Sequence, residues 1–375
     1  MKKILKRILL FLCRFVKIKE KSMLIIEKSY PSGSNTKILY DSIKDKYNVT
    51  MVHSNDIFFE RRNLKDYIKF IKMMLHVSKY HYVITTHGFI KYNPKQIVID
   101  LWHGIPMKAM AFMEKDKTIY PSEKFNADYL ITNSKLDSVL MGACTHLPFS
   151  KHKILGSPRV DYLYQKSVKS IFNMEQYNKV ILYMPTFRQG YQGRKEGEIF
   201  EHLIPVKYFN LDKFERYLEE KSYLLLIKLH PLEEGIAEKK LNFKSRNLRL
   251  VQTEELLQKG LDIYELLPSI DLLITDYSSV YLDFLILNRP IVFINYDLRK
   301  YSDVRGLLLE PYHFWTPGFE VKSFNDLIWS INNSFTDDPF QNKRLELRNL
   351  FHKYQDGKST ERVIHFLEKL MKIDK

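Results

Sequence analysis

Short aliphatic runs alternate with amphipathic helical patterns along almost the whole chain, and this alternation constrains the fold more than any other feature. Buried aliphatic strands that each lead into a helix are typical of parallel sheets covered on both faces. The alternation occurs in two series, so the sequence predicts two doubly wound, Rossmann-like α/β domains. The predicted strands are Met23–Glu27, Val49–His53, Tyr82–Thr86, Gln96–Trp102, Tyr129–Thr132 and Lys153–Leu155, then Val180–Met184, Leu224–Leu229, Leu248–Gln252, Leu272–Thr275 and Ile291–Asn295.

The length of 375 residues also fits two domains, at about 100–200 residues each. Tyr164–Asn178 is the predicted joint, so we expect an N-terminal domain over residues 21–170 and a C-terminal domain over 171–375. Only two cysteines occur, which excludes a disulfide framework and a Cys-based zinc site and favours a reducing compartment. The predicted helices are Ser34–Lys46, Asn63–Ser78, Asp212–Lys221, Ile263–Ser269, Ser279–Leu287 and Phe324–Phe335.

The N-terminal segment is unusually basic. Residues 1–22 carry a net charge of +7 out of +15 for the whole chain. Their longest apolar run, Ile8–Cys13, is far shorter than the ~20 residues that span a bilayer. Wound as a helix, residues 1–20 place apolar side chains on one half and basic side chains on the other, which predicts a helix lying on an anionic membrane surface. The alternative is a first helix that packs on the domain with a solvated basic face.

Polar residues follow four of the predicted strands, where an open α/β sheet binds its ligands. Ser278 and Ser279 begin a predicted helix, whose free N–H groups attract anions, although plain N-capping is the alternative. His230 precedes Pro231 at the end of an apolar strand, and its imidazole can donate to a phosphate, with Lys228 in support. A core histidine is the alternative there. The residues at the carboxyl ends of these four strands, called strand exits below, are Trp102-His103-Gly104, Pro185-Thr186-Phe187-Arg188, His230-Pro231 and Asp276-Tyr277-Ser278-Ser279.

His103 lies between Trp102 and Gly104, where the small residue allows close backbone approach and a neutral imidazole suits a general base. The hydroxyl and guanidinium groups of Thr186, Arg188 and Arg159 suit a phosphate. Asp283, four residues after Ser279, is placed to accept a hydrogen bond from a substrate hydroxyl. Each of these residues has a structural or surface role as its alternative. Together they indicate a cleft rich in phosphate-binding groups.

Several nucleotide-binding and catalytic motifs are absent from the sequence, namely GxGxxG, GxxxxGK[ST], GxSxG and HExxH. There is also no Asp-x-Asp pair to hold a divalent metal against a nucleotide diphosphate. We therefore expect a reaction without metal or cofactor, in which helix N-termini, hydroxyls, histidine and arginine meet the phosphate charge.

The spaced set WHGIP, GSPRVD, PTFR, KLHP and TDYSSVYLDFLILNRPIVF, with a later RG, resembles the CDP-glycerol glycerophosphotransferase family, which builds teichoic acids and related polymers. The resemblance covers about residues 80–320. It implies a two-domain, GT-B-like fold whose C-terminal domain binds CDP-glycerol. It also implies an N-terminal domain that meets an undecaprenyl-type lipid-linked acceptor, and a basic surface that holds the enzyme on the cytoplasmic face of the membrane.

The resemblance implies roles for individual residues. His103 matches the base that activates the acceptor hydroxyl, and His230 matches the histidine at the pyrophosphate that stabilises the leaving CMP. The sequence departs from the family pattern at Val160, where PR-N-D has Asn, at Met107-Lys108-Ala109-Met110 and at Phe319. The expected donor-binding residues are Trp102, Gly104, Arg159, Thr186, Arg188, Lys228, Ser278, Ser279 and Asp283.

Two other functions fit some of these features. A GT-B glycosyltransferase that uses a nucleotide sugar such as CMP-sialic acid also has His-Pro and Ser-Ser strand exits, and would form a glycosidic bond. A basic protein that binds nucleic acid without catalysis is permitted by the net charge. Because the charge concentrates in the terminal helix and no nucleic-acid motif occurs, we expect no nucleic-acid partner.

Overall fold

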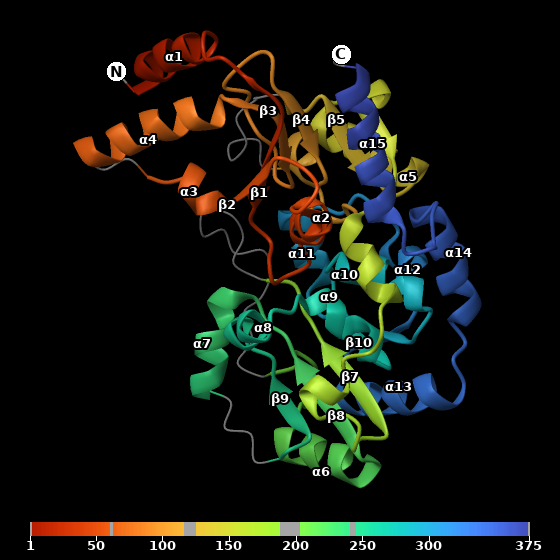
Figure 1. Ribbon diagram of the computed structural model, residues 1–375. Coiled ribbons are helices and arrows are strands. Elements are labelled where there is room, and N and C mark those ends of the chain that lie inside the picture. Colours follow the sequence, from red (N-terminus) through yellow and green to blue (C-terminus); the bar gives the residue numbers. More distant parts are fainter. Residues whose placement is uncertain (1, 61–62, 116–124, 188–202, 241–244, 374–375) are drawn as a thin grey trace. The chain divides into compact units, whose positions relative to one another are not determined.

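The computed structural model folds into two α/β units, each built on a six-stranded parallel sheet (Figure 1). It describes residues 2–60, 63–115, 125–187, 203–240 and 245–373. The first unit comprises Met1–His103, Glu123–Asp161 and Lys353–Lys375, and the second comprises Gly104–Ser122 and Tyr162–His352. The predicted pair of parallel α/β sheets is confirmed.

The first sheet has the strand order β2-β1-β3-β4-β5-β6, so the winding direction reverses between β1 and β3. Leu39 of α2 (Asn35–Ile43) and Leu367 of α15 (Ser359–Ile373) pack with Ile25 and Ile84 on one face. Met73 of α4 (Leu64–Val77) lies near Leu24, on the opposite face. The strands are β1 (Lys19–Glu27), β2 (Val49–His53), β3 (Tyr80–Thr85), β4 (Ile97–Asp100), β5 (Tyr129–Thr132) and β6 (His152–Ile154).

The second sheet has the order β12-β11-β10-β7-β8-β9 and reverses between β7 and β10. Phe214 of α6 (Leu211–Lys221) and Leu327 of α13 (Phe324–Thr336) cover one face. Ligands of open α/β sheets bind beyond the carboxyl ends of the strands at such a reversal. The strands are β7 (Lys179–Tyr183), β8 (Tyr223–Ile227), β9 (Leu248–Leu250), β10 (Leu272–Thr275), β11 (Ile291–Ile294) and β12 (Phe319–Val321).

All eleven predicted strands overlap strands of the structure, and the structure adds the three-residue strand β12, which the sequence analysis did not predict. Its start requires Gly318, where a Cβ would lie 2.0 Å from the Ile291 carbonyl oxygen. The predicted helix Ser279–Leu287 ends earlier, as α10 (Val280–Phe284) followed by a 3₁₀ turn. The remaining α-helices are α1 (Lys2–Cys13), α3 (Ser54–Ile57), α5 (Lys135–Thr145), α7 (Pro231–Lys240), α8 (Thr253–Lys259), α9 (Ile263–Leu266), α11 (Leu298–Val304), α12 (Tyr312–Trp315) and α14 (Gln341–Phe351).

The C-terminal helix α15 belongs to the first unit. Its first turn donates N–H groups of Ser359 and Thr360 to the Asp161 carboxylate, at 2.8 and 2.7 Å, which satisfies donors that a helix start leaves free. Arg362 Nε donates to the Leu155 carbonyl at 2.8 Å. The units therefore differ from the ranges 21–170 and 171–375, because α15 returns to the first sheet and Gly104–Ser122 groups with the second unit. Contacts so distant in sequence leave no local pattern.

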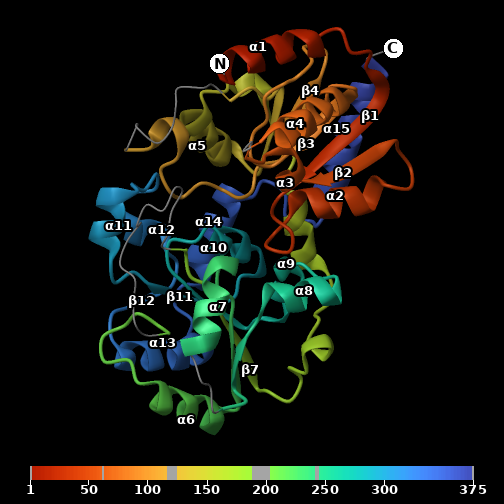
Figure 2. The same cartoon turned by 90° about the vertical axis from the view of Figure 1, so that its left-hand side faces the viewer.

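Helix α1 lies beside α4 (Figures 1 and 2). Its Leu9 and Cys13 are buried, and Asn93 Nδ2 donates to the carbonyls of Cys13 and Val16 at 3.1 and 3.0 Å. Phe11 and Phe15 of the same segment are 55% and 74% exposed. Part of the apolar face therefore packs on the unit while part stays open to solvent. Of the helices in the described ranges, none is long and apolar enough to cross a membrane.

Candidate active site

The turn after β4 presents His103 and is fixed by a buried carboxylate. Trp102 has a left-handed backbone with φ 53°, and Gly104 has φ 140°. Asp100, at the end of β4, accepts the N–H groups of Trp102 and Gly88, both at 2.8 Å. Burial raises the pKa of Asp100 to about 7, although both of these hydrogen bonds lower it. The turn is thus tied to the end of the neighbouring strand β3.

His103 is held in one tautomer. Its Nδ1 lies 2.7 Å from the Thr86 carbonyl oxygen, which only accepts, so Nδ1 carries the proton and the lone pair is on Nε2. Burial lowers the pKa of His103 to about 4; the hydrogen bond to Thr86 opposes this, and the charges of Arg159 and Lys28 add to it. The imidazole is therefore neutral at pH 7 and able to accept a proton, as a general base must be.

His87 is a member of this site that the sequence analysis missed. Its ring stacks on that of His103 with centroids 4.1 Å apart and planes 5° apart, and its Nδ1 lies 2.7 Å from Thr86 Oγ1. Burial lowers the pKa of His87, and the charges of His103 and Lys28 lower it further. The stack fixes the plane of the His103 ring. The available signal was the position of His87 just after β3, at the reversal of the first sheet.

Arg159 is 4% exposed and supports the same turn. Its Nη1 donates to the His103 carbonyl at 2.8 Å, and its backbone N–H donates to Asn35 Oδ1 at 2.9 Å. Asn35 Nδ2 in turn donates to the Trp102 carbonyl at 2.8 Å. Arg159, expected to bind donor phosphate, thus contacts backbone carbonyls of the first unit. Asn35 was also missed, because its partners are more than 60 residues away.

In the second unit, the exits of β7 and β10 meet at the sheet reversal. The Thr186 N–H donates to Asp276 Oδ1 at 2.8 Å, which joins the two exits. Ser278 and Ser279 follow, both half-buried, and neither hydroxyl has a hydrogen-bond partner within the described residues. Arg188 lies outside the described residues. The two hydroxyls are thus available to a ligand that binds at the reversal of the second sheet.

His230 has the opposite tautomer to His103. Its ring stacks on Phe187 with centroids 4.1 Å apart, and its Nδ1 accepts the Leu232 N–H at 3.3 Å, so the proton is on Nε2. Burial lowers the pKa of His230, helped by the Lys228 charge and opposed by Glu234. The His230 side chain is exposed, and its Nε2–H is a donor of the kind a phosphate oxygen accepts.

Lys228 and Asp283, both predicted to bind donor, are interior residues. Lys228 is 2% exposed, and its Nζ donates to Glu234 Oε1 at 2.5 Å, to the Leu229 carbonyl at 2.9 Å and to Thr253 Oγ1 at 3.1 Å. Asp283 is 1% exposed and accepts the Tyr264 hydroxyl at 2.7 Å. Both side chains make these contacts inside the second unit.

The predicted residues thus form two groups. The first unit contains Trp102, His103 and Arg159. The second unit contains Gly104, Thr186, Lys228, His230, Ser278, Ser279 and Asp283. Among the residues that the structure describes, no three His, Cys, Asp or Glu side chains are grouped to hold a metal ion.

Known proteins are similar over most of the chain. A family model described as CDP-Glycerol:Poly(glycerophosphate) glycerophosphotransferase matches residues 8–369. The teichoic acid ribitol-phosphate polymerase TarK of Staphylococcus aureus is 26% identical, over 92% of this chain and 68% of its own length. The teichoic acid ribitol-phosphate polymerase TarL of the same organism is 26% identical, over 88% of this chain and 58% of its own length. The teichoic acid glycerol-phosphate transferase of S. aureus is 24% identical, over 92% of this chain and 93% of its own.

Solved structures share the fold. The wall teichoic acid polymerase TagF superposes with a TM-score of 0.73 at 20% identity, covering 98% of this chain and 93% of that one. A putative UDP-N-acetylglucosamine 2-epimerase from Listeria monocytogenes has a TM-score of 0.56 at 14% identity, covering 93% and 98%. At these identities the likeness concerns the fold alone.

Proposed function

Because this chain belongs to the CDP-glycerol:poly(glycerophosphate) glycerophosphotransferase family, we propose that it transfers glycerol phosphate, or a related polyol phosphate, from a CDP-activated donor to a hydroxyl of a lipid-linked acceptor. As a relative of teichoic acid polymerases and primases it is a transferase of teichoic acid synthesis. The observation that carries the proposed chemistry is the His103 tautomer. Its Nδ1–H is committed to Thr86, which leaves Nε2 as a proton acceptor.

The proposed step is a direct displacement. Nε2 of His103 takes the proton of the acceptor hydroxyl, and the oxygen forms a bond to the β-phosphorus of CDP-glycerol. The bond from that phosphorus to the bridging oxygen breaks, and CMP leaves with the electron pair. His230 Nε2–H and the Ser278 and Ser279 hydroxyls would bind the donor phosphates, so that positioning and electrostatics supply the rate without a metal ion or cofactor.

We further propose a GT-B-like enzyme attached peripherally to the cytoplasmic face of the membrane, with no nucleic-acid partner. The support is α1 and the turn after it, which leave Ile8, Phe11, Leu12 and Phe15 at least half exposed in a strongly basic segment. Apolar and basic groups on one helix suit the interface of an anionic bilayer.

Ser278→Ala combined with Ser279→Ala is expected to weaken CDP-glycerol binding at least tenfold. Hydrogen bonds to charged groups contribute roughly 1.5–3 kcal/mol each, so loss of even one is measurable by calorimetry. The helix should survive, because the Ser279 side chain makes no capping hydrogen bond. Ser170→Ala, on an exposed serine of the same unit, is the matched control. Equal donor affinity in the double variant and the control would remove the two serines from the site.

The pH profile of kcat/KM tests the state of His103. A base must be unprotonated, and the pKa of His103 is lowered to about 4, so activity should hold as the pH falls through 6 and drop only near pH 4. Lys28→Gln should move this acidic limb to higher pH, since the Lys28 charge helps to lower the pKa. An acidic limb near 6.5 in the unmodified enzyme contradicts the assignment.

A panel of donors tests the function itself. The protein is incubated with CDP-glycerol, CDP-ribitol or CMP-sialic acid and a lipid-linked saccharide acceptor, and CMP release and the product bond are measured. We expect CMP with a CDP-polyol and a new phosphodiester. CMP released only from CMP-sialic acid, with a new glycosidic bond, would instead make the protein a glycosyltransferase.

A further inference from the structure

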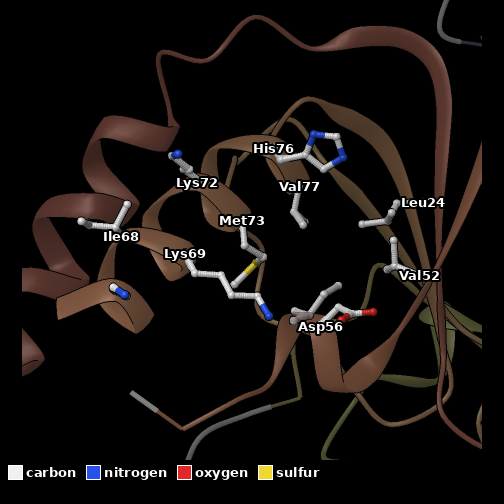
Figure 3. A pocket seen from close by; sticks show the side chains of 11 residues that line it. Leu24, Val52, Asp56, Ile68, Lys69, Lys72, Met73, His76 and Val77 are labelled. Atoms are coloured by element: carbon white, nitrogen blue, oxygen red, sulfur yellow. The ribbon is translucent and has the colours of Figure 1, made fainter. Parts of the chain in front are cut away.

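A groove in the first unit is lined by none of the candidate active-site residues. It has a volume of about 540 Å³, within the ~300–1,000 Å³ typical of small-molecule sites, and lies between α3, α4 and the β1 and β2 strands (Figure 3). Leu24, Val52, Ile57, Met73 and Val77 make its lining largely apolar. Figure 3 shows Met73 and Val77 extending from α4 toward Leu24 and Val52 on the opposite side.

One side of the groove is cationic. Lys65, Lys69 and Lys72 follow one another at helical spacing, so they share a face of α4, and all three are exposed. Lys69 lies over the Phe59 ring at 4.8 Å, while Lys65 and Lys72 have no ion pair within the described ranges. Asp56 is the one carboxylate among the lining residues, so the lining has a net charge of +2. An apolar floor beside unpaired ammonium groups is complementary to a phosphate that carries a hydrocarbon chain.

The surroundings add exposed apolar side chains to this charge. Ile68 of α4 is 46% exposed, Leu64 75% and Phe58, just after α3, 53%. A solvated lysine face alone would not expose these large apolar residues together, whereas a surface that meets lipid does. Helix α1, whose Phe11 is also exposed, packs on α4.

We propose that this groove binds the lipid end of the acceptor, with its phosphate on Lys65, Lys69 and Lys72 and the adjoining hydrocarbon chain along Val52 and Met73. The assignment rests on the proposed function, which supplies a lipid-linked acceptor. β2, at the groove, lies three strand positions from β4, which carries His103, a lateral distance of about 14 Å at roughly 4.8 Å per strand. That distance leaves room for a saccharide between the lipid phosphate and the hydroxyl at His103.

The test is titration calorimetry on the full chain with decyl phosphate below its micelle concentration. Inorganic phosphate supplies the charge without the chain, and decyl maltoside supplies the chain without the charge. We expect decyl phosphate to bind at least tenfold more tightly than either. The triple variant Lys65→Gln, Lys69→Gln and Lys72→Gln should lose at least tenfold in affinity, and Val52→Phe, which fills the groove and keeps the lysines, should also weaken binding.

The matched control is Lys46→Gln, Lys135→Gln and Lys369→Gln, which removes the same charge from exposed positions elsewhere on the same unit and should leave the affinity unchanged. Equal loss in the two triple variants, or binding of phosphate or maltoside as tight as decyl phosphate, overturns the proposal. Dihexanoyl phosphatidylglycerol binding as tightly as decyl phosphate would assign the groove to bulk phospholipid and overturn it too.

CMP release tests the proposed function, and the titration tests the groove, so the two can fail independently. If no CDP-polyol releases CMP, the titration still shows whether the groove takes a lipid phosphate. In an active enzyme, the groove variants should raise KM for the lipid-linked acceptor at least tenfold while KM for the CDP donor stays unchanged.

Discussion

His103→Ala is expected to lower turnover by roughly 10²–10⁴-fold, the usual contribution of a positioned general base. That loss corresponds to about 2.7–5.5 kcal/mol of transition-state stabilisation. Donor affinity should change little, because the residues proposed to bind the donor lie in the second unit. The measurement is single-turnover CMP release at saturating CDP-glycerol, together with calorimetric donor binding.

Three further variants make the result specific to His103. His365→Ala removes an exposed histidine from α15 of the same unit and should leave turnover unchanged. His87→Phe retains an aromatic ring against His103 and should keep most activity, whereas His87→Ala should lose more of it because the stack is gone. Full activity in His103→Ala would refute the base assignment, and weak donor binding in that variant would indicate a disturbed fold instead.

Glu234→Ala is expected to destabilise the protein by about 3–5 kcal/mol, because it leaves the Lys228 ammonium buried without its counter-charge. Glu234 also accepts the Thr253 N–H and hydroxyl, at 2.9 and 2.7 Å, and so ties α7 to the start of α8. Burial raises the pKa of Glu234, but hydrogen bonds from Lys228 and Thr253 outweigh it and hold that pKa below its ordinary value. The measurement is the free energy of unfolding in urea at pH 7.

The sign of the pH dependence follows from that lowered pKa. A carboxylate with a depressed folded pKa contributes stability above its unfolded pKa, and the contribution fades as the pH falls through the folded value. The difference in the free energy of unfolding between the original protein and Glu234→Ala should therefore become smaller as the pH falls. Glu254→Ala, on an exposed carboxylate of α8, should cost less than about 0.5 kcal/mol.

A second comparison separates loss of the ion pair from loss of packing. The pair Lys228→Met and Glu234→Leu should recover most of the stability, since apolar replacement of a buried pair is often neutral. A Glu234→Ala variant as stable as Glu254→Ala would show that the Lys228 ammonium reaches water and that the pair contributes little.

The positions of the strands could be predicted because each leaves a local signal. β2 and β5 have the predicted bounds, since aliphatic runs flanked by turn residues set their own ends. The placement of His103, His230, Ser278 and Ser279 after strands followed in turn, because parallel strands bring their carboxyl ends to one edge.

Other features depend on partners that the local sequence does not contain. The sequence analysis expected three charged residues to face a ligand, namely Arg159, Lys228 and Asp283. In the structure each of them contacts groups inside its own unit. The sequence around His87 did not indicate a functional role, which follows only from the stacking of its ring on His103. The groove beside Lys69 depends on how α4 lies over β1 and β2, which periodicity does not specify.

The sequence by itself therefore determined the alternation of strands and helices, the class of the two sheets and the residues at their carboxyl ends, since these depend on near neighbours along the chain. Only the tertiary structure decided which nitrogen of each histidine holds its proton, which charges are interior and which unit α15 joins. Those properties are set by hydrogen bonds and packing between residues far apart in sequence, such as Asp161 with Ser359, and no local pattern encodes them.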